Sequence, residues 1–164
     1  MNLSESPLNS PIEVGVRALV VLTVASPGRL DTAQLVFLDH ALLHSGDLDG
    51  GPVSLLPDLP AGPGELGLRR TLMEKGLVLL MRAGLVDLTT DEGGFLYGAT
   101  EEAASFLDTL RAPYVSKLRD RASWLAETYL REGADVREGM NQITQRWASR
   151  LRIQAPEHSE ERGQ

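Results

Sequence analysis

The chain has 164 residues, of which 42% are hydrophobic and 24% charged, and its formal net charge is −7. The length suits one domain with added segments, and the composition is ordinary for a soluble globular protein. Because the chain contains no cysteine, disulfides, thiolate zinc sites and a cysteine nucleophile are excluded.

The N-terminal sequence gives no sign of export. The start, MNLSESPLNSP, lacks the basic region and the apolar region of a signal peptide. The longest strongly apolar run, residues 18–25, is far shorter than the roughly 20 residues that a membrane span needs. We therefore expect a cytoplasmic protein without membrane contact.

The N-terminal part predicts two helices. Ser10-Pro11-Ile12-Glu13 is a capping-box pattern with proline at the first helical position, and it predicts a deeply buried helix that ends near Ala25. Its valines would also suit a strand, but the cap favours the helix. Asp31 is expected to cap a second helix over Thr32–Ser45, with Gly46 as its stop.

A segment rich in glycine and proline, Gly46–Gly64, separates these helices from a third and should be irregular. The third helix is expected over Glu65–Ala83, with Gly84 ending it. Two glycines within this helix, Gly67 and Gly76, are expected to mark close helix contacts. Its inner face is predicted to carry Leu68, Leu72, Leu79 and Leu80.

Two short strands follow the third helix. Leu85–Thr89 and Phe95–Ala99 flank a turn at Asp91–Gly94, and Thr100 is expected to cap the next helix. Helices followed by a two-stranded wing and another helix are typical of a winged helix-turn-helix module. The predicted fold class is therefore mainly α with a small β-hairpin wing, comprising a winged helix-turn-helix core and added C-terminal helices.

The C-terminal part predicts two more helices. Pro113 restarts or kinks the chain, and the next helix, which ends near Glu132, carries one apolar stripe, namely Tyr114, Leu118, Ala122, Leu125 and Tyr129. After Gly133 a narrower stripe comprises Val136, Met140, Ile143, Trp147 and Leu151. We divide the chain into a flexible N-terminus (1–9), the winged domain (10–110), a helical extension (111–152) and a flexible tail (153–164).

The charge distribution argues against a typical DNA-binding wing. Residues 85–110 hold six acidic and no basic side chains, so the wing would meet phosphates with the wrong sign. The candidate partner-binding residues are Asp87, Asp91 and Glu92 in the wing, with Trp124 and Trp147 in the C-terminal helices. Trp124 packing against its own domain, and the stripe that contains Trp147 docking there, are the alternatives.

Basic side chains outside the wing keep phosphate contact open. The candidates are Arg69 and Arg70 in the third helix, and Lys117 and Arg121 in the C-terminal helices. The alternative interpretation is that these charges form a solvated surface.

Signals for catalysis or a cofactor are weak. His40 and His44, four residues apart with Asp39 and Asp47 nearby, form a metal pair without an evident third strong ligand. The loop after Asp47 lacks the glycine and the glutamate of a calcium loop. The chain has neither a phosphate-binding loop nor a Gly-x-Ser-x-Gly elbow. We expect no enzyme activity, no metal and no cofactor.

Several segments together resemble the middle-component family of bacterial ABC-three component systems, in its second type. The resemblance covers residues 8–110 and lies in Leu8–Pro11, Glu13–Leu19, Leu42–Asp47, Gly50–Pro52, Ser54–Pro57, Gly64-Glu65, Arg69-Arg70 and Gly76–Val86. It implies a small winged-helix subunit that connects an ABC- or SMC-like, Rad50-like ATPase to an effector in anti-phage defence, as in Lamassu-type systems.

Together these observations predict a non-catalytic adaptor. Its expected partners are the ATPase and the effector, with indirect or weak DNA contact through the complex, and self-association is compatible with the sequence. The alternative is a cytoplasmic winged-helix regulator that binds DNA.

Overall fold

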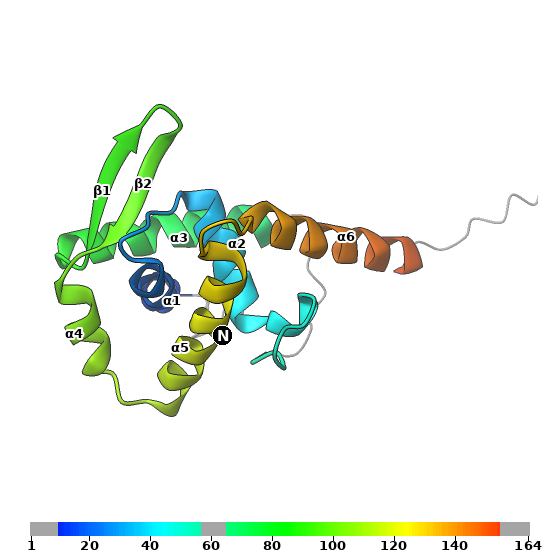
Figure 1. Cartoon of the computed structure of the whole chain (residues 1–164), viewed down its shortest axis with the longest axis horizontal. Coiled ribbons are helices and arrows are strands. Elements are labelled where there is room, and N and C mark those ends of the chain that lie inside the picture. Colours follow the sequence, from blue (N-terminus) through cyan, green and yellow to red (C-terminus); the bar gives the residue numbers. More distant parts are fainter. Residues whose placement is uncertain (1–9, 57–64, 155–164) are drawn as a thin grey trace, which may run out of the picture.

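The computed structural model of the chain describes residues 10–56 and 65–154 (Figure 1). The predicted flexible N-terminus (1–9), the segment 57–64 and residues 155–164 of the predicted tail lie outside this part. The chain is mainly helical with one two-stranded antiparallel sheet, as predicted. The helices and strands are α1 (Pro11–Ala25), α2 (Thr32–Leu43), α3 (Glu65–Arg82), β1 (Val86–Asp91), β2 (Gly94–Ala99), α4 (Glu102–Asp108), α5 (Pro113–Leu125) and α6 (Val136–Gln154).

Helix α1 lies at the centre of the molecule. It is seen end-on in Figure 1, and it contacts α2, α3, α4, α5 and β2. Ser10 caps it as predicted, because the Ser10 Oγ accepts a hydrogen bond from the Glu13 N–H at 3.2 Å. Leu19 and Leu22 are completely buried, since neighbours cover the helix on several sides. The nearly all-round apolar sequence of α1 is therefore explained by its central position.

Helix α2 begins as predicted but ends earlier. Asp31 and Gln34 form a reciprocal capping box at its start. The helix ends at Leu43 instead of Ser45, so the predicted C-terminus is wrong, and Gly46 lies within a 3₁₀ turn over Ser45–Asp47. The side chain of Ser45 donates a hydrogen bond to the Pro52 carbonyl, which fastens this turn to the following loop instead of continuing the helix.

Helices α1 and α3 cross at two glycines. A Cβ atom added to Gly76 would lie 2.8 Å from the Pro11 carbonyl oxygen and 3.0 Å from the Gly15 nitrogen. Glycine at this position therefore lets the two backbones approach closely, as predicted for Gly76. Among the residues that the structure describes, no atom lies within 4 Å of a Cβ added to Gly67, so the same prediction was wrong there.

The contact at Gly76 determines which face of α3 is buried. Met73, Leu77 and Leu80 enter the core beside this glycine. The predicted inner face was correct for Leu80, but Leu68 and Leu79 are exposed. Leucines occur around much of the helix, so hydrophobicity alone does not identify its inner side. Helix α3 ends at Arg82, one residue before the predicted end, and the turn after it contains Gly84, whose φ of 75° is the left-handed conformation that glycine adopts readily.

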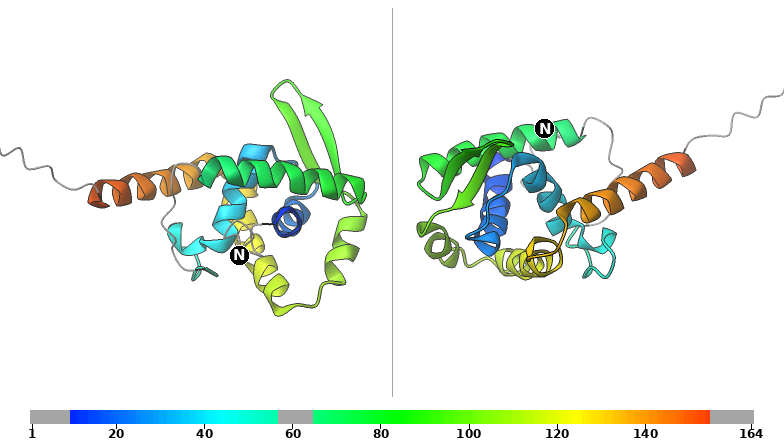
Figure 2. Two further views of the ribbon diagram at one scale, coloured as in Figure 1. Left: turned by 180° about the vertical axis from the view of Figure 1, so that it is seen from behind. Right: turned by 45° about the horizontal axis from the view of Figure 1, so that its top comes forward.

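The two strands form a hairpin that projects from the helical body (Figures 1 and 2). The register pairs Val86 with Ala99 and Asp91 with Gly94, which confirms the predicted wing and leaves a two-residue turn. An isolated antiparallel bridge joins Leu30 to Tyr97 on the other side of β2. The base of the hairpin is therefore tied to the segment between α1 and α2.

Thr100 has a different role from the predicted helix cap. Its hydroxyl donates a hydrogen bond to the Gly84 carbonyl at 2.8 Å, and its N–H donates to the Leu85 carbonyl at 3.0 Å. Helix α4 begins with Glu101 as its N-cap residue, without a side-chain cap. The Thr100 hydroxyl is therefore used to join the two ends of the wing.

Helix α5 packs against α1 and α2, and α6 contacts the 3₁₀ turn after α2. Pro113 restarts the chain as α5, and Leu118, Ala122, Leu125 and Tyr129 of the predicted stripe are buried. A π-helical turn, Ala126–Leu130, connects α5 to the loop before α6. Helix α6 extends away from the body in each view (Figures 1 and 2), and it continues to Gln154, two residues beyond the predicted extension.

We predict that Gly76→Ala lowers the free energy of unfolding by about 1–3 kcal/mol, because its Cβ would force α1 and α3 apart. Urea unfolding followed by circular dichroism measures this change. Gly67→Ala in the same helix is the matched control, and it should gain about 0.5–1 kcal/mol because its Cβ enters open space. Equal effects of the two substitutions would contradict the close crossing.

Candidate functional site

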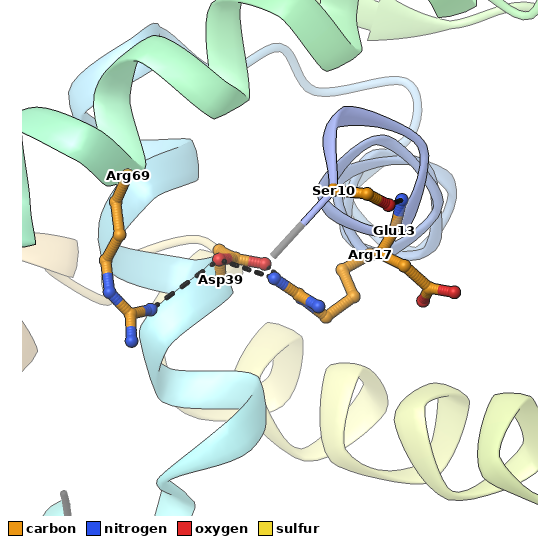
Figure 3. A network of polar contacts seen from close by, with 5 residues as sticks. All are labelled: Ser10, Glu13, Arg17, Asp39 and Arg69. Carbon is orange, nitrogen blue, oxygen red and sulfur yellow. Dashed lines mark hydrogen bonds and ion pairs between the residues drawn. The ribbon is translucent and has the colours of Figure 1, made fainter. Parts of the chain in front are cut away.

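A buried carboxylate joins the first three helices. Asp39 of α2 accepts a hydrogen bond from the Arg17 Nε of α1 at 2.5 Å, and Arg69 of α3 lies 3.8 Å from its other oxygen. The two arginines approach Asp39 from opposite sides (Figure 3). The Arg17 and Asp39 side chains are only 1% and 3% exposed, so water does little to screen their attraction.

The environment of Arg17 keeps its guanidinium charged. Burial alone would lower the pKa of Arg17, but the charge and hydrogen bond of Asp39, with a smaller contribution from Tyr114, raise it above its ordinary value. Burial raises the pKa of Tyr114, against the attraction of Arg17, so its phenol stays neutral at ordinary pH. Arg17 therefore remains a guanidinium cation beside Asp39.

The wing presents an apolar face and an acidic tip. Leu88 and Phe95 lie on the same face of the hairpin, at registers two residues apart, and are 41% and 61% exposed. Asp87, on the opposite face, forms an ion pair with Arg29 at 2.7 Å. Asp91 accepts a hydrogen bond from the Gly93 N–H and so shapes the turn. Glu92 at the tip is exposed.

A second surface lies where the outer face of α3 meets the start of α1. We call it the α1/α3 groove, and its volume is about 490 Å³. Its lining residues are Pro11, Thr71, Glu74, Lys75, Val78, Leu79 and Arg82. The α3 residues among them follow a spacing of three and four, which places them on one side of the helix.

The base of α6 is held by polar contacts with the turn after α2. Gln142 accepts a hydrogen bond from the Asp49 N–H at 3.0 Å, and Arg146 lies 3.8 Å from Asp47. His40 and His44 stack with ring centroids 4.7 Å apart, and the His40 Nε2 lies 3.7 Å from Asp47. Within residues 10–56 and 65–154, no group of three or more His, Cys, Asp or Glu side chains could hold a metal ion.

The four predicted phosphate contacts have different surroundings. Arg69 faces the buried Asp39, and Arg121 donates a hydrogen bond to the Val53 carbonyl at 2.9 Å. Arg70 forms an exposed ion pair with Glu74, and Lys117 is exposed on α5. Arg69 and Arg121 therefore have contacts within the chain, whereas Lys117 is exposed.

The two tryptophans can be placed only in part. Trp124 is half-buried and packs edge-on against Tyr129, with ring centroids 6.1 Å apart, which corresponds to the alternative of packing within its own domain. Trp147 belongs to α6, and its side chain lies outside the described part of the structure. Of the residues predicted to bind a partner, Glu92 and Asp91 are exposed near one another at the wing tip.

Sequence reasoning missed two features of the structure. The pairing of Arg17 with Asp39 was one, although a single charge in the middle of each apolar helix was a signal that a partner was needed. The exposed apolar residues of the wing and the α1/α3 groove were the other. The pattern of hydrophobic residues does not identify these exposed side chains, because the sequence does not distinguish an exposed leucine from a buried one.

We predict that Asp39→Ala lowers the free energy of unfolding by about 3–5 kcal/mol, since it leaves the Arg17 charge buried without its carboxylate. Thermal and urea unfolding measure this effect. Glu74→Ala removes the carboxylate of the exposed pair with Arg70, and it should change stability by less than about 0.5 kcal/mol. A similarly small effect of Asp39→Ala would show that the buried pair does not hold the helices together.

No helix in the described part of the chain is long and apolar enough to cross a membrane. No curated protein and no solved structure matches the chain. A family model described as ABC-three component (ABC-3C) system Middle Component 2 matches residues 7–150, which includes every helix and strand before α6 and most of α6 itself. The chain therefore belongs to the Middle Component 2 family of ABC-three component systems.

Proposed function

We propose that this component is a non-catalytic adaptor that links an ABC- or SMC-like ATPase to an effector in a cytoplasmic anti-phage defence complex of the Lamassu type. Membership of a three-component family supports the existence of partner components. The observation that carries the adaptor role is the wing, whose exposed Leu88 and Phe95 accompany an acidic tip. Apolar side chains with carboxylates favour a protein partner over a nucleic acid.

We also assign the core to the winged-helix class. The chain order supports this assignment: helix α1, the bridge residue Leu30, helices α2 and α3, and then the hairpin. The isolated bridge of Leu30 to Tyr97 takes the place of a third strand beside β2. In DNA-binding members of this class, a helix commonly enters the major groove beside the wing. The corresponding helix here is α3, whose outer face contains Val78 and Leu79 as well as cations.

The alternative, a DNA-binding regulator, has less support from the charges. Residues 85–110 contain no basic side chain, so the wing provides no cation for phosphate. Arg69 points toward Asp39 and is therefore not directed at an external phosphate (Figure 3). The proposed lack of catalysis rests on the sequence, which has no cysteine nucleophile and no recognised catalytic motif.

Co-expression of the tagged protein with the other two components of its system tests the adaptor function. We expect the ATPase and the effector to co-purify with the wild type in moderate salt. Leu88→Ala combined with Phe95→Ala should weaken this association at least about tenfold, because apolar anchors of an interface commonly contribute more than 1 kcal/mol each. The dissociation constant is measured with the purified components.

Val53→Ala is the matched control, because Val53 is also an exposed apolar residue but lies in the loop after α2. It should leave the affinity unchanged. Recovery of the protein without either component, together with tight binding to duplex DNA that falls steeply with salt, would replace the adaptor with the regulator.

A further inference from the structure

The α1/α3 groove combines an apolar centre with positive charge. Val78 and Leu79 are 41% and 42% exposed, although both are large apolar residues on a regular helix. Lys75 and Arg82 flank them, one turn before and one turn after. Glu74, the carboxylate in the lining, forms an ion pair with Arg70, so the groove keeps a net positive charge.

Lys75 and Arg82 are available to a partner. In the described part of the chain, neither side chain takes part in an ion pair or a side-chain hydrogen bond, whereas Arg17, Arg29, Arg69 and Arg121 all have contacts within the chain. The positive charge of the groove also contrasts with the net charge of −7 of the whole chain. Two unpaired cations beside exposed apolar side chains match a ligand that is both apolar and acidic.

The floor of the groove is closely packed. The close approach of Gly76 to Gly15 and Pro11 fixes the start of α1 against α3, and the buried ion pairs of Asp39 hold both helices to α2. A preformed surface of this kind loses little conformational entropy when it binds. The groove is therefore suited to receive a partner without a rearrangement of the three helices.

We propose that the α1/α3 groove binds an acidic amphipathic helix of another component of the system, and this inference rests on the proposed adaptor function. The lining residues of α3 run from Thr71 to Arg82, which is about 16 Å at the rise of an α-helix. About three turns of a partner helix would cover this length. Its apolar residues, spaced three and four apart, would meet Val78 and Leu79, and its carboxylates would meet Lys75 and Arg82.

Other occupants fit less well. The wing of a second copy has apolar and acidic residues, but a wing-to-groove contact is head-to-tail and would propagate into a ring or a filament. The groove is formed by two helices and offers no strand edge, so an extended segment could not add to it through main-chain hydrogen bonds. Duplex DNA would satisfy Lys75 and Arg82 but would leave Val78 and Leu79 against phosphates.

Site-specific photo-crosslinking in the intact co-expressed complex tests the occupant. A benzophenone amino acid replaces Leu79 in one variant and the exposed Val53 in the control. We expect the variant at Leu79 to crosslink to a segment of the ATPase or the effector that has acidic and apolar residues at helical spacing. The control should not react with that segment. A crosslink from Leu79 to a second copy of this chain would overturn the proposal.

Two double variants test the chemistry of the contact. Val78→Ala with Leu79→Ala removes the apolar centre, and Lys75→Glu with Arg82→Glu reverses the charge. Each should raise the dissociation constant of the purified complex at least about tenfold, and raised salt should shrink the effect of the charge reversal. Circular dichroism melting checks that each variant folds, and all four positions are exposed.

The outcomes separate the groove from the adaptor function. Failure of the wild type to bind either component would refute the proposed function itself. A wild-type complex whose affinity changes in neither double variant would refute only the groove. Loss of DNA binding in the charge-reversal variant, with unchanged binding to both proteins, would assign the groove to DNA instead.

Discussion

The arrangement of the first three helices depends on one buried carboxylate. Asp39 is placed in the interior of α2, where an unpaired charge would be strongly unfavourable. Arg17 and Arg69 meet it from α1 and α3, so each helix supplies one charge to the same point (Figure 3). Hydrophobic packing alone is compatible with several rotations of each helix about its axis. The ion pairs of Asp39 are compatible with only one of these rotations. Together with the crossing at Gly76, they hold α3 with one face buried and the other toward solvent.

The two exposed surfaces have opposite electrostatic character. The wing tip is acidic, with Asp91 and Glu92, and the α1/α3 groove is basic, with Lys75 and Arg82. Both contain exposed apolar side chains. The proposed adaptor would need two surfaces that do not compete for the same ligand. Opposite charges on neighbouring surfaces provide this distinction, because a segment attracted to one is repelled by the other.

The sequence predicted the types of the helices and the hairpin, because Ser10, Asp31, Gly84 and Pro113 are strong local signals. The end of α2 and the role of Thr100 were not predicted, since both depend on hydrogen bonds to distant residues. Of the candidate site, the wing could be predicted from the sequence, because its acidic residues are visible there. The groove could not be predicted from the sequence, because its position depends on the crossing at Gly76. This crossing leaves Leu79 exposed and Leu80 in the core.

The hydrogen bonds of Thr100 have a mechanical consequence. They bind the residue after β2 to Gly84 and Leu85 at the end of α3, and the bridge between Leu30 and Tyr97 braces the same base. These contacts resist a swing of the hairpin relative to α3. Each six-residue strand is about 20 Å long. A force applied at the tip of the hairpin therefore acts on α3 over this distance and tends to rotate the helix. In the proposed complex, movement of a protein bound to the wing would consequently exert a torque on α3, without any change of fold.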